Sequence, residues 1–284
     1  MEEFWVELDR ARLFVRGWGD RSGRPLLCWH GVGLTSRASL FLNEAGPLLA
    51  GGYRLRVLAL DAPGFGKSPP SERHGYQPHA LVDLIPPLLE ELGLARVAFV
   101  GFSWGGDLGC HLAARHPHSL AALVLLDAGY SDPPLDPSLT YEERVERNEL
   151  AWREKCAPSW DALVTHLRKN HPRWTVAVEE ACRAGWREQG SRLIPAVPPW
   201  VVAAVEHGMA HAPPSVTRPR LAESRLPVLL VAAGDAAEED LVQFAADVPQ
   251  AEIVRAAGTG HDVLTDGGPE VVHVVGKWLK ANDS

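Results

Sequence analysis

The sequence predicts an α/β protein with a mostly parallel sheet that helices cover on both faces. Three observations favour this fold class. Short apolar runs of strand length alternate with segments of helical periodicity along most of the chain. Several runs, such as residues 25–29, are apolar throughout, which is typical of strands buried on both faces. Glycine-rich turns or aspartates follow these runs, at the end of a parallel sheet where ligands bind.

The expected elements follow one another in an order that suits such a sheet. Residues 2–8 and 12–18 alternate apolar and polar side chains, which predicts an antiparallel hairpin at a sheet edge. The prolines Pro86 and Pro87 are expected to bend the second helix or to delay its start. The other expected strands span residues 25–29, 53–60, 97–100, 120–126, 227–233 and 251–256, and the helices span 38–50, 78–91, the segment after Ser103, 238–247 and 269–281.

Residues 130–224 differ from the rest because they show no convincing strand. Helical patterns are expected there at 141–155, 159–170, 174–188 and 198–210. We therefore expect a core domain of residues 1–129 and 225–284, with a helical cap of residues 130–224 inserted after the sixth strand and lying over the site. Five of the ten tryptophans fall in this segment. They suggest an apolar substrate pocket or, equally well, contacts that hold short helices together.

Composition bounds the function. The chain has 284 residues, 46% of them hydrophobic and 23% charged, and its net charge of −8 gives no reason to expect nucleic acid as a partner. No run reaches the roughly 18 apolar residues of a membrane helix, and the acidic N-terminus lacks the pattern of a secretion signal. We expect a cytoplasmic protein with no membrane partner. The cysteines, expected to be unpaired thiols, are Cys28, Cys110, Cys156 and Cys182.

Ser103 is the best candidate for a nucleophile. It lies in Gly101-Phe102-Ser103-Trp104-Gly105, between an apolar run and a segment of helical periodicity. A strand that turns directly into a helix brings two backbones too close for a Cβ, so glycines two residues before and after the serine suit the turn. The turn would expose the serine hydroxyl beside the free N–H groups of the helix.

A serine hydroxyl needs a base within hydrogen-bond reach, and the base needs a carboxylate to orient it. His261 follows the last expected strand in a loop of small residues, and imidazole suits both proton removal and proton delivery. Two carboxylates compete for the third position. Asp127 follows the strand after the Ser103 helix, and Asp235 follows the strand after residue 224.

A developing oxyanion needs two fixed donors, each worth roughly 2.7–4 kcal/mol in the transition state. The backbone amide of Trp104, at the helix start, is one candidate. Val32, in the loop after the first buried strand, is the other. His30 in that loop is expected to brace it.

These residues resemble the α/β-hydrolase fold family, in its capped branch of esterases, lactonases and cofactor-free haloperoxidases. The resemblance implies an eight-stranded sheet, a Ser-His-Asp triad and no cofactor or metal. In that family the turn that begins at Asp61 is structural. The motifs that carry the resemblance are His30-Gly31, Asp61-x-x-Gly64-x-Gly66-x-Ser68, Gly101-x-Ser103-x-Gly105-Gly106 and Gly260-His261.

One position departs from the family pattern. The usual acid site, after the seventh strand, holds Ala237, and Asp235 comes too early. Some members carry the acid after the sixth strand, where Asp127 lies, and we therefore favour Asp127. The resulting hypothesis is a serine hydrolase that cleaves a small-molecule ester, as a monomer or a homodimer. The alternatives are a lactone, an amide, an N-terminal proline peptide or a carbon–carbon bond and, from a different class, a ligand-binding protein without turnover.

Overall fold

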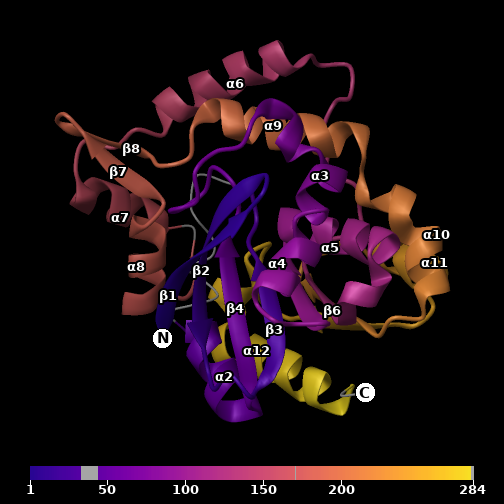
Figure 1. Ribbon diagram of the computed structural model, residues 1–284. Helices are drawn as coiled ribbons and strands as arrows, with labels where there is room; N and C mark the ends of the chain where they lie inside the picture. Colours follow the sequence, from indigo (N-terminus) through magenta and orange to yellow (C-terminus); the bar gives the residue numbers. More distant parts are fainter. Residues whose placement is uncertain (33–43, 170, 283–284) are drawn as a thin grey trace.

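The computed structural model describes residues 1–32, 44–169 and 171–282. Its main sheet has eight strands in the order β1-β2-β4-β3-β5-β6-β9-β10 (Figure 1). The strands of this sheet are β1 (Glu2–Leu8), β2 (Ala11–Trp18), β3 (Arg24–Trp29), β4 (Leu55–Asp61), β5 (Val97–Phe102), β6 (Leu120–Leu126), β9 (Val228–Ala233) and β10 (Ala251–Ala256). The sheet is antiparallel where β2 pairs with β1 and β4, and parallel elsewhere. The predicted fold class is confirmed.

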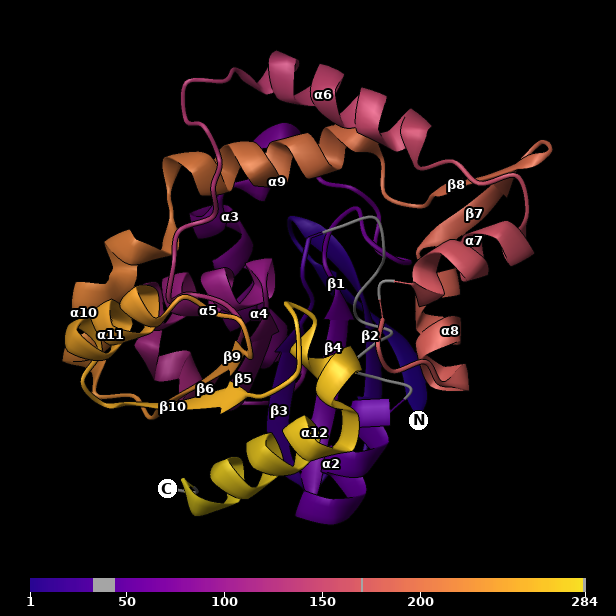
Figure 2. The same ribbon diagram turned by 180° about the vertical axis from the view of Figure 1, so that it is seen from behind.

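Helices cover both faces of the sheet. One face packs against α3, α4, α5, α10 and α11, and the other against α2 and α12 (Figure 2). The helices outside the inserted segment are α2 (Gly46–Tyr53), α3 (Pro78–Val82), α4 (Ile85–Glu91), α5 (Trp104–Arg115), α11 (Glu238–Asp247) and α12 (Val263–Ala281), with 3-10 turns η2 (Arg73–Tyr76) and η3 (Pro117–Ser119). The inserted segment adds α10 (Arg218–Ser224). Strands β4 and β9 are buried along their whole length, as their mostly apolar composition predicts.

Two strands between β6 and β9 correct the expectation that residues 130–224 contain no strand. Residues 130–224 contain the helices expected there, but also a short antiparallel hairpin of β7 (Trp186–Gln189) and β8 (Arg192–Pro195). Gly190 in its two-residue turn has φ +60°, a conformation that suits glycine. The helix expected over 174–188 therefore ends early. The helices and 3-10 turn are α6 (Tyr141–Glu154), α7 (Trp160–Arg168), α8 (Val176–Arg183), α9 (Pro199–His211) and η4 (Pro214–Thr217).

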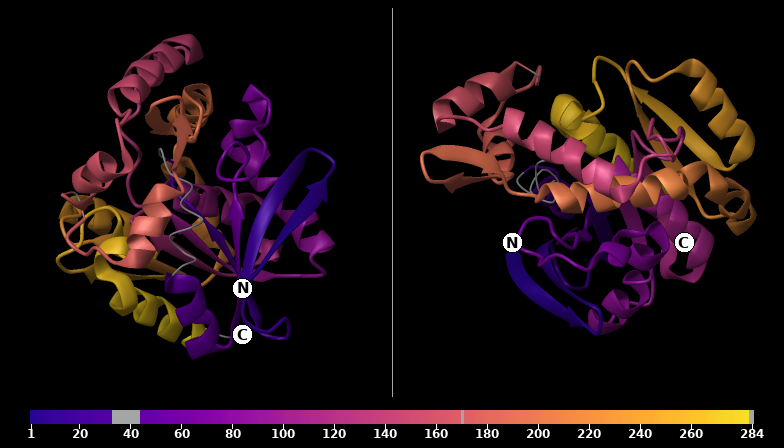
Figure 3. Two further views of the ribbon diagram at one scale, coloured as in Figure 1. Left: turned by 90° about the vertical axis from the view of Figure 1, so that its left-hand side faces the viewer. Right: turned by 90° about the horizontal axis from the view of Figure 1, so that it is seen from above.

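Helices α6 and α9 lie side by side across one end of the main sheet (Figure 3). The ring of Trp200 on α9 packs edge-on against Tyr76 of η2, with 6.0 Å between centroids. Trp160 and Trp186 instead pack on a small separate cluster with Leu163. These three tryptophans join elements together, which is the second of the two roles considered for them.

Other boundaries differ for local reasons. The helix expected over 78–91 is divided into α3 and α4, and Pro86 lies in the first turn of α4, where its missing N–H costs nothing. The last helix begins at Val263 rather than 269 and is kinked at Gly268, where φ is +50°. The helix expected over 38–50 falls partly outside the described residues, and α2 covers its last part.

Two simpler expectations concern single side chains and long helices. The four cysteines, all in the described part of the chain, form no disulfide, and Cys28, Cys110 and Cys182 are buried. Among the helices in the described parts of the chain, none combines the length and apolar character needed to cross a membrane.

Candidate active site

The turn from β5 to α5 holds Ser103 in a strained conformation, with φ 53° and ψ −126°. Glycine is required on both sides of it. A Cβ on Gly101 would lie 2.2 Å from the carbonyl oxygen of Gly105, and one on Gly105 would lie 2.4 Å from the carbonyl oxygen of Trp29. The sequence motif therefore marks a place where three backbone segments meet, as the flanking glycines predicted.

Replacing Gly101 by alanine is expected to lower the free energy of unfolding by at least about 3 kcal/mol, because backbone atoms cannot move away from the new methyl group. Gly52→Ala is the matched control. Nothing lies within 4 Å of its added Cβ, and alanine favours a helix by about 0.5–1 kcal/mol over glycine. Urea unfolding of both variants measures the difference. Equal stability of the two would contradict the close packing at this turn.

Three side chains from distant parts of the chain hydrogen-bond in series at this turn. Ser103 Oγ lies 2.9 Å from Nε2 of His261, and Nδ1 of His261 lies 2.6 Å from Oδ2 of Asp127. The side chain of His261 is 61% exposed and that of Asp127 is 6% exposed. The hydroxyl end of the series is thus open to a ligand, while its carboxylate end is shielded from water.

The hydrogen bond of His261 decides between the two candidate acids in geometric terms. It goes to Asp127, directly after β6, whereas Asp235 is exposed in the turn after β9. Asp127 has φ +45°, one of the few non-glycine residues in this conformation among the described residues. This strained backbone turns its carboxylate toward the loop that carries His261.

Two further groups bind the carboxylate of Asp127 and were missed at the sequence level. The backbone N–H of Ala233 donates to Oδ1 at 2.8 Å, and the Tyr130 hydroxyl donates to the same oxygen at 2.9 Å. Both hydrogen bonds stabilise the charged carboxylate. Burial and the negative charge of Asp127 raise the pKa of Tyr130, so its hydroxyl keeps the proton that it donates.

The candidate oxyanion donors lie on the two segments that flank Ser103. Trp104 is the first residue of α5, so its N–H has no acceptor within the helix. Gly31, just before Val32, approaches Ser103 so closely that a Cβ there would lie 3.0 Å from the serine Cβ. Val32 is half-buried. The backbone at Gly31 therefore runs beside the serine, where the N–H of the next residue, Val32, can serve a bound oxygen.

His30 and Asp61 hold neighbouring turns in place. His30 is fully buried; its Nε2 accepts a hydrogen bond from the Ala62 N–H at 3.0 Å, so its Nδ1 carries the proton and donates to the Gly31 carbonyl. Asp61 Oδ2 accepts from the Lys67 N–H at 2.9 Å. Both residues connect backbone segments, in agreement with the bracing role expected for His30.

A second buried carboxylate lies behind the loop of Asp127. Oδ1 of Asp107, on α5, accepts the N–H of Gly129 at 2.9 Å. Burial raises the pKa of Asp107 to about 7, while the hydrogen bond from Gly129 acts in the opposite direction and the charge of Asp132 adds to the rise. Asp107 is therefore protonated in the folded protein at pH values where an exposed aspartate is charged.

This raised pKa predicts a pH-dependent stability. An unfolded aspartate titrates near pH 3.9, so between about pH 4 and 7 the folded chain binds more protons at Asp107 than the unfolded chain. The contribution of Asp107 to stability therefore falls as pH rises through this window, by up to roughly 4 kcal/mol.

The variant Asp107→Asn tests this. It keeps the acceptor for Gly129 and should remove the loss of stability between pH 4 and 7. The difference in unfolding free energy between variant and wild type should grow from pH 4 to 7; a constant difference would contradict the buried, protonated acid. Asp235→Asn, at an exposed position, is the control.

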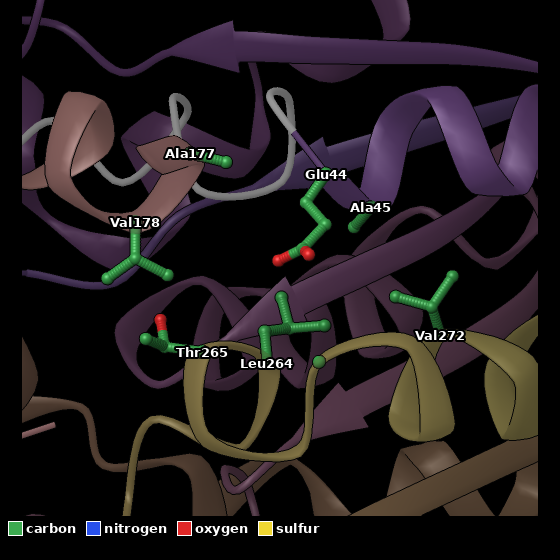
Figure 4. A pocket seen from close by; sticks show the side chains of 8 residues that line it. Glu44, Ala45, Ala177, Val178, Leu264, Thr265 and Val272 are labelled. Atoms are coloured by element: carbon green, nitrogen blue, oxygen red, sulfur yellow. The ribbon is translucent and has the colours of Figure 1, made fainter. Parts of the chain in front are cut away.

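A narrow pocket lies away from these groups, between α2, α8 and α12 (Figure 4). Its volume is about 10 Å³, which is room for a single water molecule. Arg173, in the inserted segment, lies at this junction, where it pairs with Glu44 and donates to the Thr265 carbonyl. The pocket is too small for a substrate, and its surroundings join the inserted segment to the core.

Comparison with known proteins extends these observations. A family model described as the alpha/beta hydrolase fold matches residues 24–267. The chain is 34% identical over 192 residues to the lipase LipV of Mycobacterium tuberculosis, covering 62% of this chain and 66% of the lipase. It is 36% identical over 105 residues to a 2-hydroxy-6-oxononadienedioate/2-hydroxy-6-oxononatrienedioate hydrolase of Cupriavidus pinatubonensis, covering 37% of this chain and 35% of that protein. The chain thus spans about one third to two thirds of the length of these two relatives.

Solved structures resemble the whole chain. A thermophilic esterase from Thermogutta terrifontis superposes with a TM-score of 0.72 at 23% identity, covering 100% of both chains. The structure of E-2-(acetamidomethylene)succinate hydrolase superposes with a TM-score of 0.79 at 20% identity, covering 98% of both. At these identities the likeness concerns the fold alone. Because the family model spans most of the sequence and the sheet order and serine turn agree with it, the chain belongs to the α/β-hydrolase fold family.

Proposed function

We propose that the chain is a serine hydrolase that cleaves small carboxylic esters through an acyl-enzyme intermediate. In this proposal Ser103 is the nucleophile, His261 the general base and acid, and Asp127 the residue that orients the imidazole. The observation that carries it is the continuous series of hydrogen bonds from Ser103 Oγ through His261 to Asp127. A serine that is strained, exposed to a ligand and joined to a base in this way matches the needs of nucleophilic catalysis.

In the first half-reaction, Ser103 Oγ attacks the ester carbonyl carbon while Nε2 of His261 takes the hydroxyl proton. The carboxylate of Asp127 favours the imidazolium that forms. The carbonyl oxygen becomes an oxyanion, which the N–H groups of Val32 and Trp104 would bind. When the tetrahedral intermediate collapses, the bond to the alcohol oxygen breaks and His261 returns its proton to the alcohol. The acyl group remains on Ser103.

In the second half-reaction, His261 takes a proton from water, and the hydroxide oxygen attacks the acyl carbon. The second tetrahedral intermediate collapses, Ser103 leaves with the proton from His261, and the carboxylic acid is released. The 61% exposure of the His261 side chain leaves space for this water and for the ester.

We also propose that residues 130–224 act as a lid over this site, with residues 1–129 and 225–284 as the core domain. Support comes from α9, which packs on η2 through Trp200 and Tyr76, and from α6, which lies beside α9. The lid would supply the surface that selects the acyl or alcohol group.

A second candidate reaction uses the same residues on another bond. The relative named for a 2-hydroxy-6-oxononadienedioate substrate favours a carbon–carbon bond, whereas the lipase favours an ester. Lactones, amides and N-terminal proline peptides also fit a serine nucleophile. We place the ester first because the match to the lipase is longer than the match to the other relative, and because an alcohol is a better leaving group than an amine or a carbanion.

A substrate panel tests this order. Wild type and Ser103→Ala should be assayed against short-chain aryl esters, lactones, anilides, a proline-anilide and a vinylogous 1,5-diketone. We expect kcat/KM to be highest for the esters and lost in the variant. If another class of substrate has a higher kcat/KM, that class replaces the ester in the proposal. If wild type binds members of the panel tightly but does not turn them over, the ligand-binding alternative is favoured.

A further inference from the structure

The loop after β6 is held from three other elements. Gly129 N–H donates to Asp107 of α5, and the Tyr130 carbonyl accepts Nη2 of Arg218 at 2.7 Å. Arg218 begins α10, where the inserted segment returns to the core, and its Nη1 binds Oδ2 of Asp247 on α11 at 2.8 Å. The Arg218 side chain is only 9% exposed. The buried guanidinium, paired with a partly exposed Asp247, holds the backbone of Tyr130 in place.

The fixed backbone directs the Tyr130 side chain onto the carboxylate of Asp127. Its hydroxyl donates to Oδ1, while Oδ2 of the same carboxylate accepts from His261. The backbone N–H of Ala233 also donates to Oδ1. Tyr130 is therefore the only side chain besides His261 for which a hydrogen bond to Asp127 is recorded among the residues that the structure describes. Removing its hydroxyl leaves the backbone donor in place.

We propose that Tyr130 is a positioning residue, held by Arg218, that sets the basicity of His261 by binding the far oxygen of Asp127. The effect of Tyr130 on the reaction rate rests on the proposed function, whereas its effect on the pKa of the His261 imidazole does not. Neither the hydroxyl nor Arg218 contacts the nucleophile.

The physical reason is competition for the charge of one carboxylate. The hydroxyl draws negative charge toward Oδ1, so less of it stabilises the imidazolium at Oδ2. Removing the hydroxyl should concentrate charge on the side of His261, raise the pKa of the imidazole and free the carboxylate to rotate. The higher pKa and the looser geometry should both lower activity at neutral pH.

Other titratable groups, charged or buried, act on the same loop. They include Asp107 on α5, Asp132 within the loop, Arg218 on α10, Asp235 before α11 and Asp240 in the first turn of α11. All of them are retained when Tyr130 is replaced by phenylalanine. A change between wild type and this variant therefore reports the hydroxyl rather than these charges.

The test is an NMR titration of the His261 imidazole, assigned with His261→Gln, in wild type, Tyr130→Phe and Tyr53→Phe. The control Tyr53→Phe removes a hydroxyl that hydrogen-bonds to His273 on α12. We expect the midpoint of His261 to rise by about half a pH unit or more in Tyr130→Phe and to stay unchanged in Tyr53→Phe. A midpoint that stays or falls in a folded Tyr130→Phe protein would overturn the proposal.

Kinetics give the second measurement. In Tyr130→Phe the acid limb of kcat/KM should move to higher pH with the NMR midpoint, and kcat should fall by about tenfold. A lower kcat with an unmoved acid limb would mean that Tyr130 only supports the fold, and would also overturn the proposal.

If wild type has no hydrolase activity, the proposed function fails, but the NMR titration still decides the role of Tyr130. Thermal unfolding of each variant, and the downfield Nδ1 proton of His261 as a marker of its bond to Asp127, verify that the compared proteins are folded.

Discussion

Replacing Ser103 by alanine is expected to lower kcat for ester hydrolysis by about a millionfold, the scale seen when the nucleophile of a serine hydrolase is removed. Without Oγ no acyl-enzyme can form, and His261 has no proton to take from residue 103. The remaining activity would come from water held near the oxyanion donors. Folding should be preserved, because within the described part of the chain the serine hydroxyl hydrogen-bonds only to His261. Stopped-time product assays at high enzyme concentration measure the residual activity.

The matched control is Ser191→Ala, at an exposed serine in the turn between β7 and β8. Its kcat should stay within about twofold of wild type, as for most exposed substitutions. If Ser103→Ala retained more than about a tenth of wild-type kcat, Ser103 could not be the nucleophile and the acyl-enzyme mechanism would be excluded.

The second large effect concerns the acid. Asp127→Asn should lower kcat by about ten-thousandfold, because the amide cannot stabilise an imidazolium and favours the wrong tautomer of His261. The backbone donor Ala233 N–H and the Tyr130 hydroxyl can still bind the amide oxygen, so the variant is expected to keep its fold. Steady-state kinetics and thermal unfolding together separate loss of chemistry from loss of structure.

Asp235→Asn decides between the two aspartates considered from the sequence. Asp235 is exposed, and the hydrogen bond of His261 goes to Asp127. The kcat of the Asp235→Asn variant should therefore differ from that of wild type by less than about twofold. A loss in Asp235→Asn equal to that in Asp127→Asn would mean that His261 exchanges between the two carboxylates during turnover.

Most of the sheet could be predicted from the sequence, because its buried strands appear there as short apolar runs. The run 120–126 and the helix 238–247 have the predicted bounds, since neighbouring turns end each apolar pattern sharply. The hairpin of β7 and β8 could not be predicted in the same way. Its strands have only four residues each, and β7 is mostly exposed whereas β8 is mostly buried. The hairpin is fixed by the pairing of its two strands and by the bridge between Ala157 and Leu193, a contact across distant positions.

Candidate site residues could be identified where the proposed chemistry restricts the residue type. Ser103 is marked by glycines that the turn requires, and His261 by a small-residue loop after the last strand. Tyr130 and Asp107 were not found, because a tyrosine and an aspartate have many ordinary structural roles. Their position around Asp127 depends on the turn after β6, where the positive φ of Asp127 and Gly129 directs the chain back over α5. No pattern in the sequence reports that turn.

The most direct measurement is the site of reaction with a fluorophosphonate probe. Peptide mapping by mass spectrometry should find one phosphonyl group on Ser103 of wild type, none in Ser103→Ala, and much slower labelling in His261→Ala. Labelling that persists in Ser103→Ala, or a wild-type chain that hydrolyses esters while Ser103 stays unmodified, would contradict the proposed nucleophile.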